Sequence, residues 1–291
     1  MDQSIYTWNP WHGCHKCKTG CLHCYVCEQD KCIGVNYNNI KLNKVQFRLP
    51  VQKFRNKEKK LEKYELEYKI PNGSIINVCD TSDFFLEEAD VWRVDAWDYI
   101  HKRKECLFSI TTKRTNRIKQ CLPDNWLDGW YNVRICASIS CENDAWDLIP
   151  SLLDLPIKHL GIEISPMVED VDLSPFLSSG LIEQVIVRGE RYNGYDGISR
   201  LLDINWVYNV QEQCKDYNVN FIFDATGTRL KLRNNQIIKI KPRDEHGLAE
   251  FYSMDYSDDS IINWKAEASE IERQLLNEDA YRIFKLINQE S

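Results

Sequence analysis

The sequence lacks any run of about 18 apolar residues, the minimum for a helix that crosses a bilayer, so we expect no membrane-spanning segment. Its first residues also lack the basic segment and following apolar segment of a secretory signal peptide. We therefore expect a cytoplasmic protein. There is no internal repeat of fixed period, no low-complexity tract and no long stretch with the composition of a disordered chain.

Positive charge is in deficit. The chain has 37 Lys and Arg against 44 Asp and Glu, for a net charge of −7. The overall composition thus does not indicate a nucleic-acid-binding protein, although a local basic cleft is compatible with an acidic total. Hydrophobic residues make up 43% and charged residues 28%, as in ordinary folded proteins. The length of 291 residues suffices for one α/β barrel or two smaller domains.

Short apolar runs alternate with helical patterns along the chain, which predicts βα units and a parallel sheet. The α/β fold expected is a partial or complete parallel (β/α) barrel. The predicted strands are Ile5–Trp8, Ser74–Cys79, Cys106–Thr111, Val133–Ile139, His159–Ile164, Gln184–Val187 and Val219–Phe223. Apolar residues at helical spacing predict helices over 87–103, 146–153 and 204–217.

Charged residues follow several of these strands, where barrel enzymes place their chemistry. The candidates at this edge are Asp83, Lys113, Glu142, Glu163, Arg188 and Glu190. Each of them alone is equally compatible with a helix cap or a loop start. As a set they predict a polar site at the mouth of the barrel.

Two segments depart from the βα rhythm. Residues 33–73 form an insertion between the first two predicted strands, and residues 258–291 form a predicted amphipathic helix. The predicted organisation is a barrel over residues 1–257 followed by a C-terminal helical extension.

Six of the 12 cysteines fall between residues 14 and 32. In a reducing compartment such clustering indicates metal binding more than disulfides. A structural zinc site ordinarily separates its two C-x2-C pairs by a dozen or more residues, and here three residues separate them. A ferredoxin run would have a different spacing and a following proline. A redox C-x2-C pair remains open, although so many neighbouring cysteines would be redundant for it.

A three-cysteine [4Fe–4S] site fits the segment best. Cys17, Cys21 and Cys24 have the C-x3-C-x2-C spacing of radical SAM enzymes, in a loop that follows the first predicted strand. Three thiolates leave one iron of the cluster open, and an open iron can chelate a substrate or cofactor. The segment is therefore predicted to be an N-terminal cluster-binding loop.

Several ordered motifs carry a family resemblance. Trp8-Asn9-Pro10, Gly13-Cys14, Gly20-Cys21-x2-Cys24-Tyr25, Thr81-Ser82-Asp83, Thr112-Lys113-Arg114, Ser140-Cys141-Glu142-Asn143, Glu163-Ile164-Ser165-Pro166 and Arg188-Gly189-Glu190 occur in this order over roughly residues 5–228. The chain resembles the phage Gp37/Gp68 family of three-cysteine-motif proteins, DUF5131, which looks like a divergent radical SAM barrel. The family spacing C-x6-C-x2-C implies Cys14, Cys21 and Cys24 as cluster ligands, with Cys17 as the alternative third ligand.

The resemblance implies a [4Fe–4S] cluster and S-adenosylmethionine (SAM) as cofactors, and reductive cleavage of SAM. It also implies a reductant protein such as a flavodoxin or ferredoxin, and a nucleic-acid or nucleotide substrate as a candidate. Cofactor contacts are expected from Tyr25, Asp83, Lys113, Glu142, Glu163, Arg188 and Glu190. The glycine-rich G-G-E-P motif of typical radical SAM enzymes is absent after the second strand. A non-catalytic, metal-stabilised barrel that works with a partner is the alternative, and the sequence does not indicate an oligomeric state.

Overall fold

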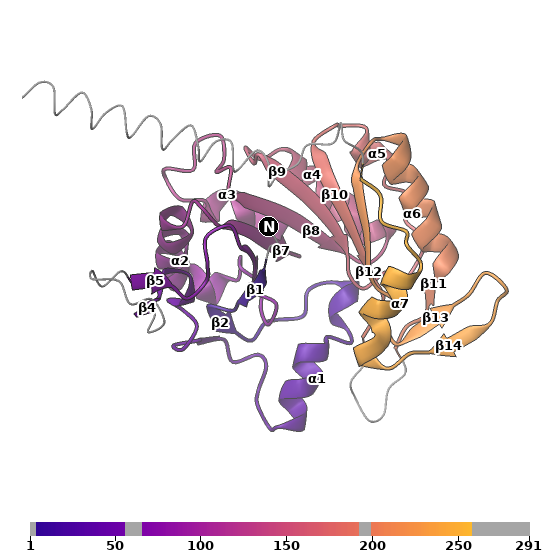
Figure 1. Cartoon of the computed structure of the whole chain (residues 1–291), viewed down its shortest axis with the longest axis horizontal. Helices are drawn as coiled ribbons and strands as arrows, with labels where there is room; N and C mark the ends of the chain where they lie inside the picture. Colours follow the sequence, from indigo (N-terminus) through magenta and orange to yellow (C-terminus); the bar gives the residue numbers. More distant parts are fainter. Residues whose placement is uncertain (1–3, 56–65, 192–198, 258–291) are drawn as a thin grey trace, which may run out of the picture.

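A curled sheet of seven parallel strands forms the centre of the protein (Figure 1). The computed structural model describes residues 4–55, 66–191 and 199–257. The strands, in their order across the sheet, are β1 (Ile5–Trp8), β6 (Ile75–Val78), β7 (Leu107–Thr112), β8 (Val133–Ile139), β9 (His159–Ile164), β10 (Ile182–Arg188) and β12 (Asn220–Ala225). All seven predicted strands are confirmed, and their spatial order follows the chain.

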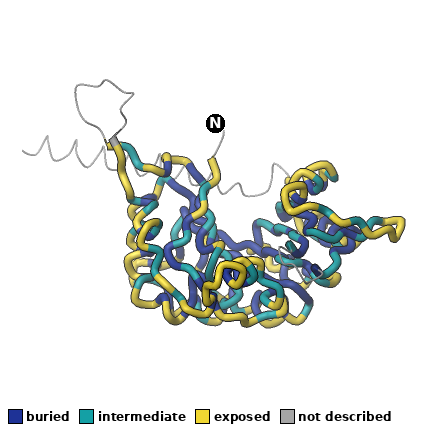
Figure 2. Tube along the Cα trace, turned by 90° about the horizontal axis from the view of Figure 1, so that it is seen from below, coloured by how far each residue is buried: buried dark blue, intermediate teal, exposed yellow. Residues whose placement is uncertain are grey.

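The sheet is a half-barrel, with β1 and β12 at its two edges in the part of the chain that the structure describes. The central strands β8 and β9 are buried along their entire length. Such burial is expected where a parallel sheet is covered on both faces, and it explains why most residues of these strands are apolar. The buried exceptions are Arg134 and Ser138 in β8 and His159 and Glu163 in β9. Figure 2 shows the buried residues along the inside of the curl and the exposed ones on its outside.

Helices connect the strands as βα units. Their bounds are α1 (Tyr25–Cys32), α2 (Asp90–Lys102), α3 (Thr115–Cys121), α4 (Glu142–Leu153), α5 (Ser174–Leu177), α6 (Ile204–Asp216) and α7 (Glu245–Phe251). Helix α4 packs on β8, while α6 and α7 pack on β12. The three predicted helices are confirmed as α2, α4 and α6. The short α1, α3, α5 and α7 were not predicted.

Three small sheets lie outside the half-barrel. β2 (Trp11–His12) pairs with β3 (Lys41–Leu42), and β4 (Lys53–Arg55) pairs with β5 (Leu66–Tyr68). β11 (Leu202–Asp203) pairs with β13 (Arg229–Lys231), which forms an antiparallel hairpin with β14 (Ile237–Lys239). The described part of the insertion at 33–73 therefore supplies strands to two of these small sheets and none to the parallel sheet.

An aromatic cluster anchors the start of the chain to the helices. The Trp11 ring lies 5.3 Å from Phe84, which in turn lies 4.8 Å from Trp97 of α2. All three side chains are nearly inaccessible to solvent, and the Trp11 indole donates a hydrogen bond to the Asp83 carbonyl oxygen at 3.1 Å. Trp11 and Trp97 are thus core residues, and their contacts fix the segment that leads into the cysteine loop.

The predicted C-terminal helix at 258–291 lies outside the described residues. Among the residues that are described, no helix has both the length and the apolar character that a bilayer crossing demands.

Candidate cofactor site at the carboxyl ends of the strands

A cavity of about 560 Å³ opens at the carboxyl ends of the parallel strands. Its walls include Asp80 after β6, Thr111 of β7, Glu163 of β9, Arg188 of β10 and Asp224 of β12. Because parallel strands all end at the same edge, residues far apart in sequence meet here. The volume lies within the range of small-molecule sites, about 300–1,000 Å³.

The cysteine loop, defined here as residues 13–24, lies across this edge of the sheet. Gly13 starts it with φ of +94°, and a Cβ at this position would lie 2.6 Å from the Tyr37 carbonyl oxygen. Only glycine tolerates both the left-handed backbone and the close approach. The Cys14 amide then donates to the same Tyr37 oxygen at 3.0 Å, and the Ser82 hydroxyl donates to the Gly13 oxygen at 2.5 Å. These contacts fix the position of Cys14.

Gly20 brings the middle of the loop against the end of β8. A Cβ on Gly20 would lie 2.2 Å from Ser140 Oγ, 3.2 Å from Pro166 Cδ and 3.3 Å from Lys113 Nζ. Ser140 is fully buried. The backbone at Gly20 therefore passes so close to the sheet that no side chain fits, which places the neighbouring Cys21 against the cavity.

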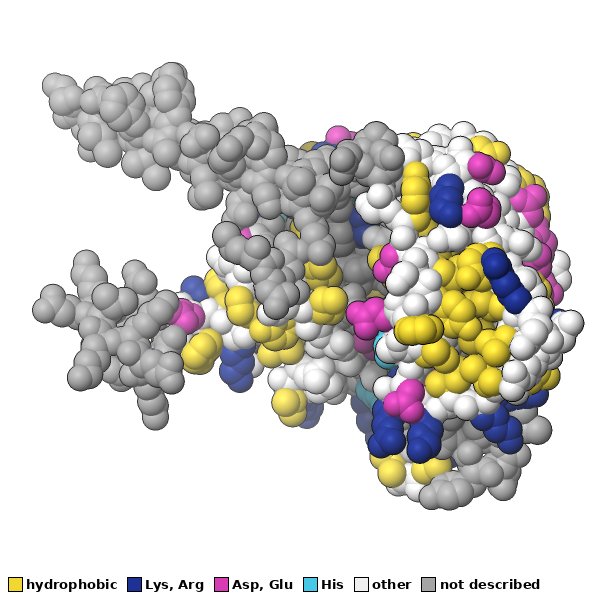
Figure 3. Space-filling model, turned by 45° about the vertical axis from the view of Figure 1, so that its right-hand side comes forward, with side chains coloured by type: hydrophobic (Ala, Val, Ile, Leu, Met, Phe, Trp, Pro, Cys, Tyr) yellow, Lys and Arg dark blue, Asp and Glu magenta, His cyan; other side chains and the backbone are white. Residues whose placement is uncertain are grey.

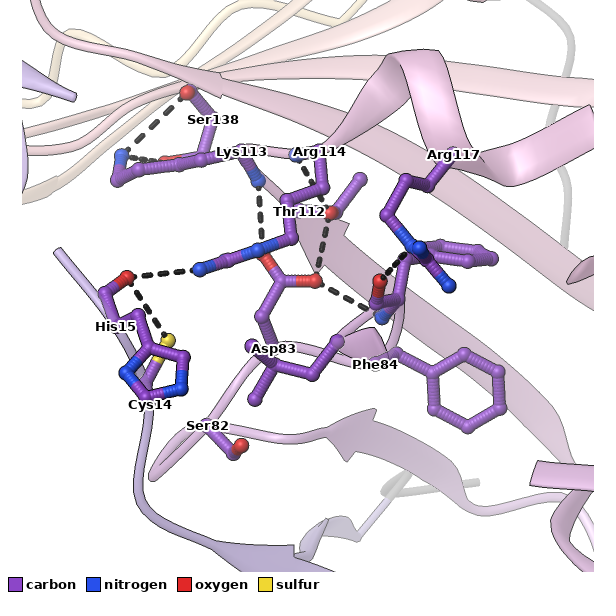
Figure 4. A network of polar contacts seen from close by, with 12 residues as sticks. Cys14, His15, Ser82, Asp83, Phe84, Thr112, Lys113, Arg114, Arg117 and Ser138 are labelled. Atoms are coloured by element: carbon purple, nitrogen blue, oxygen red, sulfur yellow. Dashed lines mark hydrogen bonds and ion pairs between the residues drawn. The ribbon is translucent and has the colours of Figure 1, made fainter. Parts of the chain in front are cut away.

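One buried ion pair fastens the first half of the loop (Figure 4). The Arg114 guanidinium donates to Asp83 Oδ2 at 2.9 Å and to the His15 carbonyl oxygen at 2.7 Å. Asp83 is 4% exposed, and it also accepts hydrogen bonds from the Thr112 hydroxyl and the backbone N–H of Phe85. Charge-assisted bonds of this kind are short and directional. The carboxylate at the end of one strand thus holds an arginine that holds the loop.

A second arginine fastens the other half of the loop in the same way. Arg200 donates to the buried Glu190 carboxylate at 2.9 Å and to the Thr19 carbonyl oxygen at 3.0 Å. Glu190 also contacts His23 Nδ1 at 3.0 Å. Burial opposes ionisation of Glu190, but the hydrogen bonds from Arg200 outweigh it and lower the pKa of this carboxyl group. We call the Asp83–Arg114 and Glu190–Arg200 pairs the two arginine clamps.

Three of the loop cysteines line the cavity: Cys14, Cys21 and Cys24. Cys17 is exposed and does not line it. The Tyr37 hydroxyl lies 3.7 Å from Cys24 Sγ, and burial raises the pKa of Tyr37, with further contributions from the Cys14 and Cys24 thiols. Tyr37 therefore stays protonated between these two thiols.

The environments of these thiols give them different acidities. A hydrogen bond from Cys17 lowers the pKa of Cys21 to about 5 against the effect of burial, and Lys113 contributes further. Burial raises the pKa of Cys14 to about 11. Cys21 therefore ionises more readily than Cys14, and a thiol has to lose its proton before it can bind a metal.

A single metal ion and a [4Fe–4S] cluster need different arrangements of ligand side chains. Within residues 4–55, 66–191 and 199–257, no three His, Cys, Asp or Glu side chains come close enough to hold a single metal ion. A [4Fe–4S] cluster makes a different demand, because each thiolate binds its own iron. Cys14, Cys21 and Cys24 line one cavity together with the charged residues at the strand ends, so their number and chemistry fit three such thiolates.

The remaining charged residues of the cavity form a partly paired set. Arg188 contacts both Glu163 and Asp224 at 2.5 Å. Lys113 Nζ donates to the Ser138 hydroxyl at 2.5 Å and to the Ser165 carbonyl oxygen at 3.0 Å, which are neutral acceptors. The Ser138 carbonyl oxygen, at 3.4 Å, is a third neutral acceptor, and no carboxylate of the described residues pairs with Lys113, so its positive charge can still attract an anionic ligand.

The structure brings together most of the candidate contacts from the sequence. Tyr25, Asp83, Lys113, Glu163, Arg188 and Glu190 all line the cavity with the three cysteines. Glu142, the first residue of α4, does not line the cavity. Its carboxylate instead accepts hydrogen bonds from the Trp146 indole and from the backbone N–H of Asp172. Asp83 and Glu190 line the cavity but are held by the arginine clamps.

Sequence reasoning missed four residues that shape the site: Gly20, Tyr37, Arg114 and Arg200. Arg114 lies in a motif that the sequence did single out, directly after β7. The signal for Gly20 was its place immediately before Cys21. Tyr37 and Arg200 carry no local signal, since they reach the loop only through the fold.

These features define an α/β half-barrel protein whose cysteine loop covers the carboxyl edge of a parallel sheet. The sequence profile of DUF5131, described as a protein of unknown function, matches residues 2–275. The chain therefore belongs to the DUF5131 family. No curated protein matches the chain, and no solved structure matches it.

Proposed function

We propose that this protein is an iron–sulfur enzyme of the radical SAM type, in keeping with the resemblance to Gp37/Gp68 proteins. One observation carries the proposal: Cys14, Cys21 and Cys24, and not Cys17, line the same cavity as the strand-end charges. Three thiolates suit a [4Fe–4S] cluster with one open iron. When bound, such a cluster supplies an electron that cleaves SAM held at the open iron.

The residues of this chain would bind and orient the cofactors. Cys21, whose pKa is lowered by its contact with Cys17, is suited to be the first ligand, and the two clamps hold the loop that carries all three thiols. Lys113, whose hydrogen-bond partners are neutral, is suited to bind the carboxylate of SAM. Tyr25 lies in the wall beside Cys24 and provides an aromatic surface. A reductant protein such as a flavodoxin or ferredoxin would supply the electron.

The test begins with protein purified and reconstituted without oxygen. We expect about four irons and four sulfides per chain, and 5′-deoxyadenosine formed from SAM after dithionite reduction. Cys14→Ala, Cys21→Ala and Cys24→Ala should each lose SAM cleavage. Cys17→Ala should retain it.

Cys32→Ala is the matched control, because Cys32 is an exposed cysteine that does not line the cavity. Loss of cleavage in Cys17→Ala but not in Cys14→Ala would reassign the third ligand. Stoichiometric zinc without sulfide, and no cleavage of SAM, would refute the proposal and favour a metal-stabilised binding protein.

A further inference from the structure

The segment between Asp224 and Asp244 reverses the charge balance of the chain. It contains no acidic residue and six basic ones: Arg229, Lys231, Arg233, Lys239, Lys241 and Arg243. The whole chain, in contrast, has a net charge of −7. This segment folds as the β13–β14 hairpin, which projects from the body of the protein in both ribbon views (Figures 1 and 2).

The register of the hairpin places its charges on one face. Arg229 lies directly opposite Lys239, and Lys231 lies opposite Ile237. Because side chains alternate along a strand, these four residues share a face, while Leu230 and Ile238 point the other way and pack into the core. Two cations in direct cross-strand register repel each other. This repulsion destabilises the hairpin, and an anion bound over the two cations would remove it.

Of the six basic residues, Lys239 and Lys241 are the ones free to bind, since Arg233 stacks on the Tyr208 ring and Arg243 lies 3.6 Å from Asp244. Lys231 pairs with Asp203, and the Arg229 guanidinium donates to the Ser199 carbonyl oxygen. Lys239 and Lys241 are exposed, and no carboxylate of the described residues pairs with either of them. Figure 3 shows several Lys and Arg side chains below the large hydrophobic patch on the face turned toward the viewer.

The tip of the hairpin carries side chains of the types that can pair with nucleic-acid bases, and one of them, Arg233, lies over the Tyr208 ring at 3.6 Å. Arg233, Asn234, Asn235 and Gln236 are all exposed there. Arginine pairs with guanine and Asn or Gln with adenine through two hydrogen bonds. A two-stranded β-ribbon is also one of the elements that fit the major groove. Amide groups at the tip distinguish this surface from one built only to attract anions.

The hairpin begins at the rim of the cavity. The Thr228 amide donates to the Glu190 carbonyl oxygen at 3.0 Å, and Gly227 packs against the backbone of Gly189. Both Gly189 and Glu190 line the cavity. A polyanion bound along the basic face of the hairpin would therefore have one end close to the cavity.

We infer that the β13–β14 hairpin is a nucleic-acid-binding arm, with its basic face on the phosphates and its tip toward the bases. The inference that the arm binds nucleic acid depends only on the hairpin and not on the proposed function. The further step, that nucleic acid is the substrate of the cavity, rests on the proposed function.

The test measures binding of the full-length protein to short labelled duplex DNA, single-stranded DNA, duplex RNA and single-stranded RNA by fluorescence anisotropy. At 0.1 M salt each lost phosphate contact on duplex DNA costs about 8-fold in affinity. We expect Lys239→Ala/Lys241→Ala to bind at least about 10-fold more weakly than wild type. The slope of log affinity against log salt should fall by about 2.

Lys104→Ala/Lys119→Ala is the matched control, since it removes the same charge from exposed positions on another part of the surface. This variant should bind as wild type does. Equal losses in the two double variants, or no salt-dependent binding to any of the four nucleic acids, would overturn the inference. Binding to anionic vesicles in place of nucleic acid would overturn it too. SAM cleavage without added nucleic acid is measured in parallel, so failure of the arm and failure of the proposed function are told apart.

Discussion

The closest approach between the cysteine loop and the sheet provides a test of the site's architecture. In Gly20→Ala the new methyl group would lie 2.2 Å from Ser140 Oγ, a distance that real side chains do not adopt. Ser140 is fully buried at the end of β8, so the hydroxyl has little room to move away. The loop has to shift outward instead, and the thiol of Cys21 shifts with it.

The size of the effect follows from overpacking. Inserting a methyl group into a packed site typically costs about 1–3 kcal/mol. The other two neighbours, Pro166 Cδ at 3.2 Å and Lys113 Nζ at 3.3 Å, are tight but tolerable. Most of the cost therefore arises at a single oxygen atom. Removing that atom should remove most of the cost.

Ser140→Ala supplies the rescue. Its Oγ has no hydrogen-bond partner among the described residues, so the single variant should be neutral or slightly stabilising. We expect Gly20→Ala to lower the free energy of unfolding in urea by about 2 kcal/mol. It should also reduce iron incorporation on reconstitution. Gly20→Ala/Ser140→Ala should recover most of both.

The double-mutant cycle isolates the contact, because the two sites touch and their effects are not additive. A coupling free energy near zero would show that Gly20 does not lie against Ser140. Normal iron incorporation in a destabilised Gly20→Ala would show that the contact is structural and does not position the cluster ligands. Either result would refute the reasoning.

Three further predictions concern the same site. In metal-free protein, iodoacetamide should label Cys21 at pH 7 well before Cys14, because their pKa values are about 5 and 11. The Cys14 rate should rise about 10-fold per pH unit, and equal pH profiles by mass spectrometry would contradict this. Arg188→Met should lower the free energy of unfolding by about 2 kcal/mol, since it leaves the largely buried Glu163 without its cation, and Arg188→Met/Glu163→Gln should recover part of the loss. Metal removal by a chelator should leave the far-ultraviolet circular dichroism spectrum of a folded α/β protein, because the loop is held by protein contacts; collapse to a random-coil spectrum would contradict this.

The parallel sheet was predictable because its determinants are local. Runs such as Val133–Ile139 and His159–Ile164 are buried on both sides, so most of their residues are apolar whatever surrounds them. The charged ends of the strands were predictable for the same reason. Parallel topology by itself brings the carboxyl ends of strands together.

The exact roles of the site residues were not predictable, because they depend on contacts between distant segments. Arg114 reaches His15 across 99 positions, and Arg200 reaches Thr19 across 181. Sequence reasoning predicted a cofactor contact for Asp83, which does line the cavity, but it did not foresee that the oxygens of Asp83 accept from Arg114 and from neighbouring protein donors. A carboxylate that binds a ligand and one that holds a loop look alike in a sequence. Only the fold distinguishes them.

The two arginine clamps explain how an irregular loop can present thiols in a defined arrangement. Each clamp places a guanidinium between a buried carboxylate and a loop carbonyl oxygen, so the charge is paired and the loop position is set by the ends of two strands. Ordering the loop costs conformational entropy, and the sheet edge supplies the compensating contacts during folding. These protein contacts hold the loop that carries the thiols, and we therefore expect the loop to depend less on a metal than small zinc domains do, in which the metal itself orders the chain.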